Sequence, residues 1–317
     1  MKALHFAGRH GTWVAASGIA IGYLVPTLSD ALGSVLLPML CAMLGLSIAR
    51  TDWSRLAVLA RRPQTAILQT VWLLLAAPLA TLAVVSMLPL PPRLAEAIVL
   101  FAAVGPMTAT PGLALLFGID AAVALAGLVL CSIIAPVTLP TVALILLDLE
   151  IPIAPEVLGL RLAGVVAVAL VIGVVVRRLA GAERLARARV ELDGAFSIVF
   201  GIVAIAVMAG MRARTEADPL GMALIVAVAC TVYIAWLVGG TLLFLPAGRE
   251  TALAVGLNTS ARNYALLLAV LGASATAEVA AMAAAVQLPM YLLPLVQRPL
   301  YRHLLSGRAL TSRNPVK

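Results

Sequence analysis

The chain has 317 residues, of which 63% are hydrophobic and only 11% are charged. This composition is too apolar for an ordinary soluble domain and indicates an integral membrane protein. Apolar segments fill almost the whole length, so no separate soluble domain is expected, and the formal charge of +8 does not indicate nucleic-acid binding. We expect the partners to be the lipid bilayer and a small-molecule solute.

The apolar segments predict ten membrane-spanning helices, because one span needs about 20 mainly apolar residues. We place them at residues 12–28, 31–49, 63–88, 94–117, 120–147, 156–176, 190–211, 220–245, 250–271 and 275–297. The first is read as a retained helix, because no small-residue cleavage site precedes the second span. Residues 301–317 are expected to form a cytoplasmic tail.

The basic residues predict the orientation of the chain, because cytoplasmic loops collect Lys and Arg. With both termini in the cytoplasm, the outer side receives only Arg93, Arg161, Arg212 and Arg214. Arg262 lies within a span, and all other Lys and Arg residues then fall on the inner side. The most basic segment, residues 177–189, is expected to lie against anionic lipid.

A polar segment interrupts the ninth span. Residues Asn258 to Asn263 include Thr259, Ser260 and Arg262 between apolar flanks. An Arg at the centre of a span costs roughly 2.5–3.5 kcal/mol on insertion scales, so it normally faces a cavity or a partner. Arg262 is therefore a candidate functional residue. The alternative is that it snorkels to the membrane surface or satisfies a buried helix end.

The two halves of the chain show a weak internal repeat. A shift of 154 residues places segment 96–118 on segment 250–272, with Glu at the head and Gly at the foot of both. The halves, residues 1–152 and 153–300, each hold five predicted spans. An odd number of spans forces the halves into opposite orientations, and transporter folds are often built from such inverted repeats.

The fourth span is expected to break where the repeat aligns it with the polar segment of the ninth. Gly105, Pro106 and Pro111 in the fourth span and Gly256 in the ninth are the predicted helix-breaking residues. An ordinary proline kink is the alternative for the fourth span. Two interrupted spans at matching positions indicate a binding site near the bilayer midplane. We predict that the solute contacts Thr108, Thr110, Thr259, Ser260, Arg262 and Asn263.

Four features resemble the bile acid:sodium symporter family and its bacterial homologues. They are LLPMLCAMLGLSIARTDW in the second span, GPMTATPGLALLFGIDAAVAL in the fourth and fifth, the prolines at the end of the fifth, and RETALAVGLNTSARN in the ninth. The resemblance implies a secondary transporter of a bacterial inner membrane with two inverted five-helix repeats. Spans three to five and eight to ten would form a core domain in which spans four and nine unwind and cross at the midplane. Spans one, two, six and seven would form a panel domain.

Several positions that bind sodium in that family are replaced here. The family has a Glu two residues before the Gly of the ninth-span motif, followed by a Gln and an Asn, and the matching positions hold Ala254, Asn258 and Thr259. A Ser-Asn pair at the fourth-span break becomes Thr110-Pro111. Asn258 is a candidate ion ligand and sodium a candidate coupling ion, but most of the oxygen ligands that hard cations prefer are missing. No other cofactor or metal is expected.

These replacements suggest that the fixed charge of Arg262 stands in for a bound cation and attracts an anionic solute. We therefore predict secondary active transport of a small organic solute, preferably an anion, by alternating access. The alternatives are a proton-coupled or uncoupled permease or efflux carrier, and a membrane sensor of the same fold that does not transport. The sequence holds no HExxH motif and no nucleophile with a nearby base, so we do not expect an enzyme.

Overall fold

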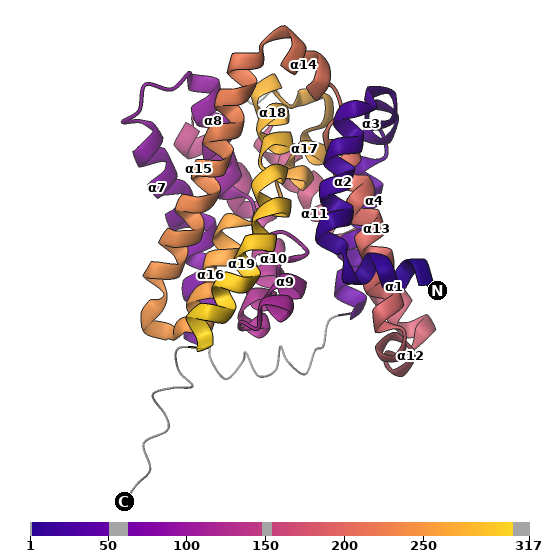
Figure 1. Cartoon of the computed structure of the whole chain (residues 1–317). Helices are drawn as coiled ribbons and strands as arrows, with labels where there is room; N and C mark the ends of the chain where they lie inside the picture. Colours follow the sequence, from indigo (N-terminus) through magenta and orange to yellow (C-terminus); the bar gives the residue numbers. More distant parts are fainter. Residues whose placement is uncertain (1, 51–62, 148–153, 307–317) are drawn as a thin grey trace, which may run out of the picture.

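The computed structural model describes the whole chain except residues 1, 51–62, 148–153 and 307–317. Within the described ranges every regular element is a helix (Figure 1). A single isolated β-bridge joins two of the described residues. Six of these helices are long and apolar enough to cross a membrane, or seven if one bent pair is counted as a single span. The prediction of an all-helical membrane protein is confirmed at this level.

The first half contains α1 (Lys2–Arg9), α2 (Gly11–Leu24), α3 (Pro26–Gly33), α4 (Leu36–Arg50), α6 (Pro63–Val71), the π-helix η1 (Trp72–Ala76), α7 (Ala77–Val85), α8 (Pro92–Ala103), α9 (Thr110–Phe117) and α10 (Ala121–Leu147). Helices α6, η1 and α7 run on as one continuous segment. The predicted first span, residues 12–28, is interrupted, because the chain bends by 107° between α2 and α3. Val25 precedes Pro26 at this bend, and a residue before proline disfavours the helical conformation.

The second half contains α11 (Pro155–Ala180), α12 (Ala182–Arg187), α13 (Arg189–Val207), α14 (Met211–Ala217), α15 (Pro219–Leu243), the 3-10 helix η2 (Leu245–Ala247), α16 (Arg249–Ser260), α17 (Tyr264–Leu271), the 3-10 helix η3 (Gly272–Ser274), α18 (Ala277–Ala285) and α19 (Gln287–Ser306). Residues 301–306 of the expected tail therefore belong to α19. The buried ring of Tyr301 packs edge-on against Phe117, with centroids 5.3 Å apart, and this contact holds the last turns. The rest of the tail, and Arg55, Arg61 and Arg62, lie outside the described residues.

Small residues allow the long helices to approach closely. Helix α4 packs on α11, α13 packs on α2, and α16 packs on both α15 and α10. A Cβ atom at Gly45 of α4 would lie 2.6 Å from Ile172, and one at Gly173 of α11 would lie 2.7 Å from Ile48. Helix packing in membranes depends on such contacts, because lipid chains are as apolar as the side chains they replace.

Both predicted interruptions occur, but one lies later in the chain than expected. The first separates α8 from α9 and contains Gly105 and Pro106, while Pro111 lies in the first turn of α9, where a missing donor costs little. The second separates α16 from α17, after Ser260. Gly256 does not break its helix, because it lies inside α16. Its role is close packing: a Cβ atom at Gly240 of α15 would lie 3.2 Å from the Gly256 Cα.

The packing of α15 on α16 predicts opposite outcomes for two neighbouring glycines. A Cβ atom at Gly240 would lie 2.6 Å from the Thr259 hydroxyl, whereas one at Gly239 meets nothing within 4 Å. We expect Gly240→Ala to lower the midpoint of thermal unfolding in detergent by several degrees. Gly239→Ala should leave it unchanged or raise it, because alanine favours a helix by about 1 kcal/mol over glycine. Equal midpoints for the two variants would contradict the packing.

Candidate functional site

The two interruptions meet and pair through their backbones. Pro106 and Arg262 form an antiparallel β-bridge. Next to it, the Met107 amide donates to the Ala261 carbonyl over 2.8 Å, and the Asn263 amide donates to the Gly105 carbonyl over 2.9 Å. Irregular backbone at membrane depth persists only where protein buries it or a cavity lines it. This paired segment, the crossover, is therefore a defined structure in which each break satisfies the polar groups of the other.

The Arg262 side chain lies entirely inside the protein, with 0% of its surface exposed. Its Nε donates to the Thr259 carbonyl over 2.7 Å. Its Nη1 donates to the Val104 carbonyl over 2.8 Å and to the Leu73 carbonyl over 3.0 Å. Nη2 has no hydrogen-bond partner among the described residues. The guanidinium group thus joins three segments that are distant in sequence.

Two of these carbonyls come from the ends of interrupted helices. Val104 follows the last residue of α8, and Thr259 lies in the last turn of α16. The final carbonyls of a helix have no intrahelical donor, and each helix C-terminus carries a partial charge of about −0.5. Two such ends therefore roughly balance the single positive charge of Arg262. The expected alternative, that this arginine satisfies a buried helix end, describes the contacts that the structure contains.

The third carbonyl is set free by the π-helix. The Ala77 amide donates to the Trp72 carbonyl, five residues earlier. The residue five positions after Leu73 is Pro78, which has no N–H to donate. The Leu73 carbonyl therefore lacks a donor in its own helix, and Arg262 supplies one. Single π-turns of this kind occur frequently at functional sites.

Trp72 adds a second link between the π-helix and α16. Its Nε1 donates to the Thr259 hydroxyl over 3.1 Å, and that hydroxyl donates to the Val255 carbonyl over 2.7 Å. The indole ring also packs edge-on against Trp236 of α15, with centroids 5.6 Å apart. Trp72 is not among the site residues predicted from the sequence. The one local signal was Pro78 within an otherwise apolar segment.

The predicted solute contacts divide into two groups. Thr110 and Ser260 are fully buried, and their hydroxyls donate to the nearby Met107 and Leu257 carbonyls over 3.0 Å and 3.3 Å. Thr259 and Arg262 are held in the same way by backbone groups. Thr108 and Asn263 form the second group, because they line small cavities beside the crossover and neither is held by a backbone carbonyl among the described residues; Arg262 also lines the smaller cavity. The Asn263 Nδ2 lies 3.4 Å from the Thr108 hydroxyl.

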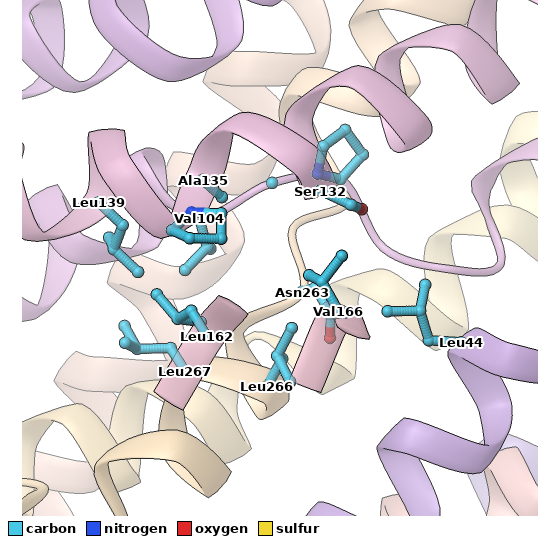
Figure 2. Close-up of a pocket in the computed structure, with 13 residues that line it drawn as sticks. Leu44, Val104, Ser132, Ala135, Leu139, Leu162, Val166, Asn263, Leu266 and Leu267 are labelled. Atoms are coloured by element: carbon cyan, nitrogen blue, oxygen red, sulfur yellow. The ribbon is translucent and has the colours of Figure 1, made fainter. Parts of the chain in front are cut away.

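Two small cavities flank Asn263. The larger is about 40 Å³ and is bounded by α4, α10, α11, α17 and the break after α8 (Figure 2). Figure 2 shows Asn263 and Ser132 as polar groups among mainly apolar side chains, including Leu162 and Leu267. The smaller is about 20 Å³ and is lined in part by Thr108, Arg262, Asn263 and Gln287. A water molecule needs a cavity of at least about 10–15 Å³, so these two cavities hold only a few water-sized groups.

The candidate ion ligand Asn258 lies where α16 packs against α10. Its Nδ2 donates to the Ala124 carbonyl over 3.1 Å, and the Gln69 Nε2 donates to the Val123 carbonyl over 3.0 Å. Both amides crowd the position where Gly127 lacks a side chain. The Asn258 Oδ1 and Gln69 Oε1 have no hydrogen-bond partner among the described residues. Two neutral oxygens are thus what these side chains could offer to a hard cation.

Comparison of the chain with models of known protein families gives no match, and comparison with curated proteins gives no related sequence.

The three contacts of Arg262 predict that Arg262→Gln destabilises the protein. Glutamine is shorter and has only two N–H donors, so at least one buried carbonyl loses its partner, at a cost of about 1–3 kcal/mol each. We expect the midpoint of thermal unfolding in detergent to fall by roughly 5–10 °C. Arg262→Lys keeps the positive charge but lacks the planar guanidinium. Its unfolding midpoint should lie between those of the parent protein and Arg262→Gln.

The matched control is Arg298→Gln, which alters an exposed arginine of α19. It should leave the unfolding midpoint unchanged. If Arg262→Gln were as stable as the parent protein, the guanidinium would not be holding the crossover together.

Proposed function

We propose that the protein is a secondary transporter that moves a small organic anion across the membrane by alternating access. One observation carries the proposal: two interrupted helices meet at the crossover, beside a cavity bounded by helices on both sides. Interrupted helices that expose backbone ends to a solute are a recurring device of secondary transporters. In this proposal the ten predicted segments all cross the membrane, with both termini in the cytoplasm.

The helix boundaries support two inverted repeats. Helices α9 and α17, which follow the two interruptions, have eight residues each, and a shift of 154 residues relates both their first and their last residues. The same shift aligned the two halves of the sequence. A repeat of five segments per half places α9 and α17 in opposite directions, so that their N-termini converge on the crossover from opposite sides.

The electrostatics of the crossover favour an anion. The charge of Arg262 is roughly balanced by the C-termini of α8 and α16, whereas the N-termini of α9 and α17 carry a partial positive charge of about 0.5 each. Thr108 lies two residues before α9, and Asn263 is the residue before α17. Both line the cavities, so they are the side chains that we expect to contact the solute. Thr110, Thr259, Ser260 and Arg262 would then hold these contacts in place.

The arrangement also supports the likeness to bile acid:sodium symporters. The core would comprise α6 to α10 and α15 to α19, and the panel would comprise α1 to α4 and α11 to α13. The larger cavity has α10 and α17 of the core on one side and α4 and α11 of the panel on the other. At about 40 Å³ it is too small for an organic solute, so the core must move against the panel to admit one.

The contacts of Arg262 argue against sodium as the coupling ion. In this proposal the guanidinium of Arg262 takes the place of a bound cation, because it already supplies the positive charge at the two helix ends. Transport would then not depend on sodium, which leaves a proton-coupled carrier or an uncoupled permease as the two forms of the proposal. A sensor that binds without transporting remains the second candidate, because it would use the same crossover.

A fixed internal cation predicts that the protein is indifferent to sodium. We expect equal midpoints of thermal unfolding, within about 1 °C, in NaCl, KCl and choline chloride of matched ionic strength, because a ligand stabilises only a protein that binds it. Stabilisation by sodium alone would show that a cation site exists, for which Asn258 and Gln69 would be the first candidates.

Asn263 provides the test of solute binding. We expect Asn263→Ala to weaken the binding of short-chain mono- and dicarboxylates by about tenfold, because a hydrogen bond to a charged group is lost. Thr231→Ala alters an exposed hydroxyl of α15 that donates to its own helix and serves as the control. Exchange of labelled carboxylates across proteoliposomes separates the two candidates, because a sensor binds without exchange. A parent protein that neither binds nor exchanges these anions would refute the proposal.

A further inference from the structure

A polar contact joins α11 to α17 near one end of the larger cavity. The Nη1 of Arg161 in α11 donates to the backbone carbonyl of Val270 in α17 over 3.0 Å. Val270 lies in the last turn of α17, where carbonyls lack intrahelical donors and the helix end carries a partial negative charge. A guanidinium group therefore binds this helix end favourably.

The position of the contact relates it directly to the cavity. Leu162, the residue after Arg161, lines the cavity from α11, and Leu266, one turn before Val270, lines it from α17 (Figure 2). On both helices the contact therefore lies beyond the lining residues in the same direction. That direction leads to the start of α11 at Pro155 and to the end of α17, which the charge distribution assigns to the outer side of the membrane.

We propose that the contact between Arg161 and Val270 is the outer gate of this cavity. The inference rests on the proposed alternating access, in which α11 belongs to the panel and α17 to the core. The contact forms when the two domains close on the outer side and breaks when they separate there. Arg161 is an exposed residue near the predicted outer end of α11, so breaking the contact leaves no charge buried inside the protein without a partner.

The same helix holds a contact of the same chemistry that should not act as a gate. The Nη1 of Arg177 donates to the Ala49 carbonyl of α4 over 3.4 Å. Helices α11 and α4 both belong to the panel, so this contact moves with the panel as a whole. Arg177→Leu is therefore the matched control for Arg161→Leu. Each variant removes one guanidinium from α11, but only Arg161 makes a contact between the panel and the core.

Access to the cavity can be measured by alkylation of a cysteine at position 132. Ser132 lines the cavity, and Ser132→Cys would be made after Cys41, Cys131 and Cys230 have been replaced by alanine. A membrane-impermeant maleimide added to right-side-out vesicles then reports on opening to the outside. We expect Arg161→Leu to raise the labelling rate by about tenfold, because a charge-assisted hydrogen bond is lost. Arg161→Lys should raise it less, and Arg177→Leu should leave it unchanged.

The measurement needs no solute, so it is independent of the transport assay. Faster labelling in Arg161→Leu, with carboxylate exchange absent from the parent protein, supports the gate and counts against transport. Unchanged labelling in a protein that exchanges carboxylates overturns the gate alone. An equal rise in Arg177→Leu also overturns it, because general loosening of α11 would then explain the effect. If Arg161→Leu does not fold, the comparison is made with Arg161→Lys, whose rate must exceed that of the parent.

Discussion

A single buried guanidinium group supplies hydrogen bonds to three backbone carbonyls that their own helices leave without donors, and the centre of the molecule depends on these bonds. Each carbonyl is freed by a different interruption: the end of α8, the end of α16 and the π-turn before Pro78. A buried carbonyl without a donor costs about 1–3 kcal/mol, and in hydrocarbon no water can replace it. By donating to all three carbonyls, Arg262 removes this cost and allows the three interruptions to lie together.

The same bonds explain why a charge can lie inside the protein at all. An isolated buried ion is strongly unfavourable, and such groups persist only when they are paired and hydrogen-bonded. No carboxylate forms an ion pair with Arg262 among the described residues. The balancing charge comes instead from two helix C-termini, each equivalent to about half an elementary charge. This arrangement leaves the N-termini of α9 and α17 as the unbalanced positive ends beside the cavities, which is why an anion is the solute class that we propose.

Rigidity at the crossover limits where movement can occur. Backbone pairing between Gly105–Met107 and Ala261–Asn263, together with the arginine, ties α8 to α16. Close contacts at glycines tie α4 to α11 in a similar way. The larger cavity lies between these two tightly packed groups of helices. A change of shape that admits a solute would therefore separate the two groups of helices. Polar contacts between the groups, such as that of Arg161 with Val270, would then control access to the cavity.

Much of the candidate site was predictable because its signals are local. Proline at 106, glycine at 105 and the polar residues after Leu257 each oppose a continuous apolar helix, whatever their neighbours are. The break in the ninth segment was placed too early at Gly256, because glycine has two roles that sequence does not separate: it weakens a helix, and it lets another helix approach. Here the approach of α15 decides, and the helix continues to Ser260.

The amino-acid sequence by itself determined that the chain is an apolar, all-helical membrane protein with two interrupted segments and an arginine beside one of them. Those properties depend on composition and on neighbours along the chain. Only the tertiary structure decided what Arg262 contacts, because the Leu73 and Val104 carbonyls are 189 and 158 residues away and every residue has the same carbonyl group. The role of Trp72, the two cavities around Asn263 and the contact of Arg161 with α17 were hidden for the same reason. Each depends on which backbone groups are left without partners once the helices have packed.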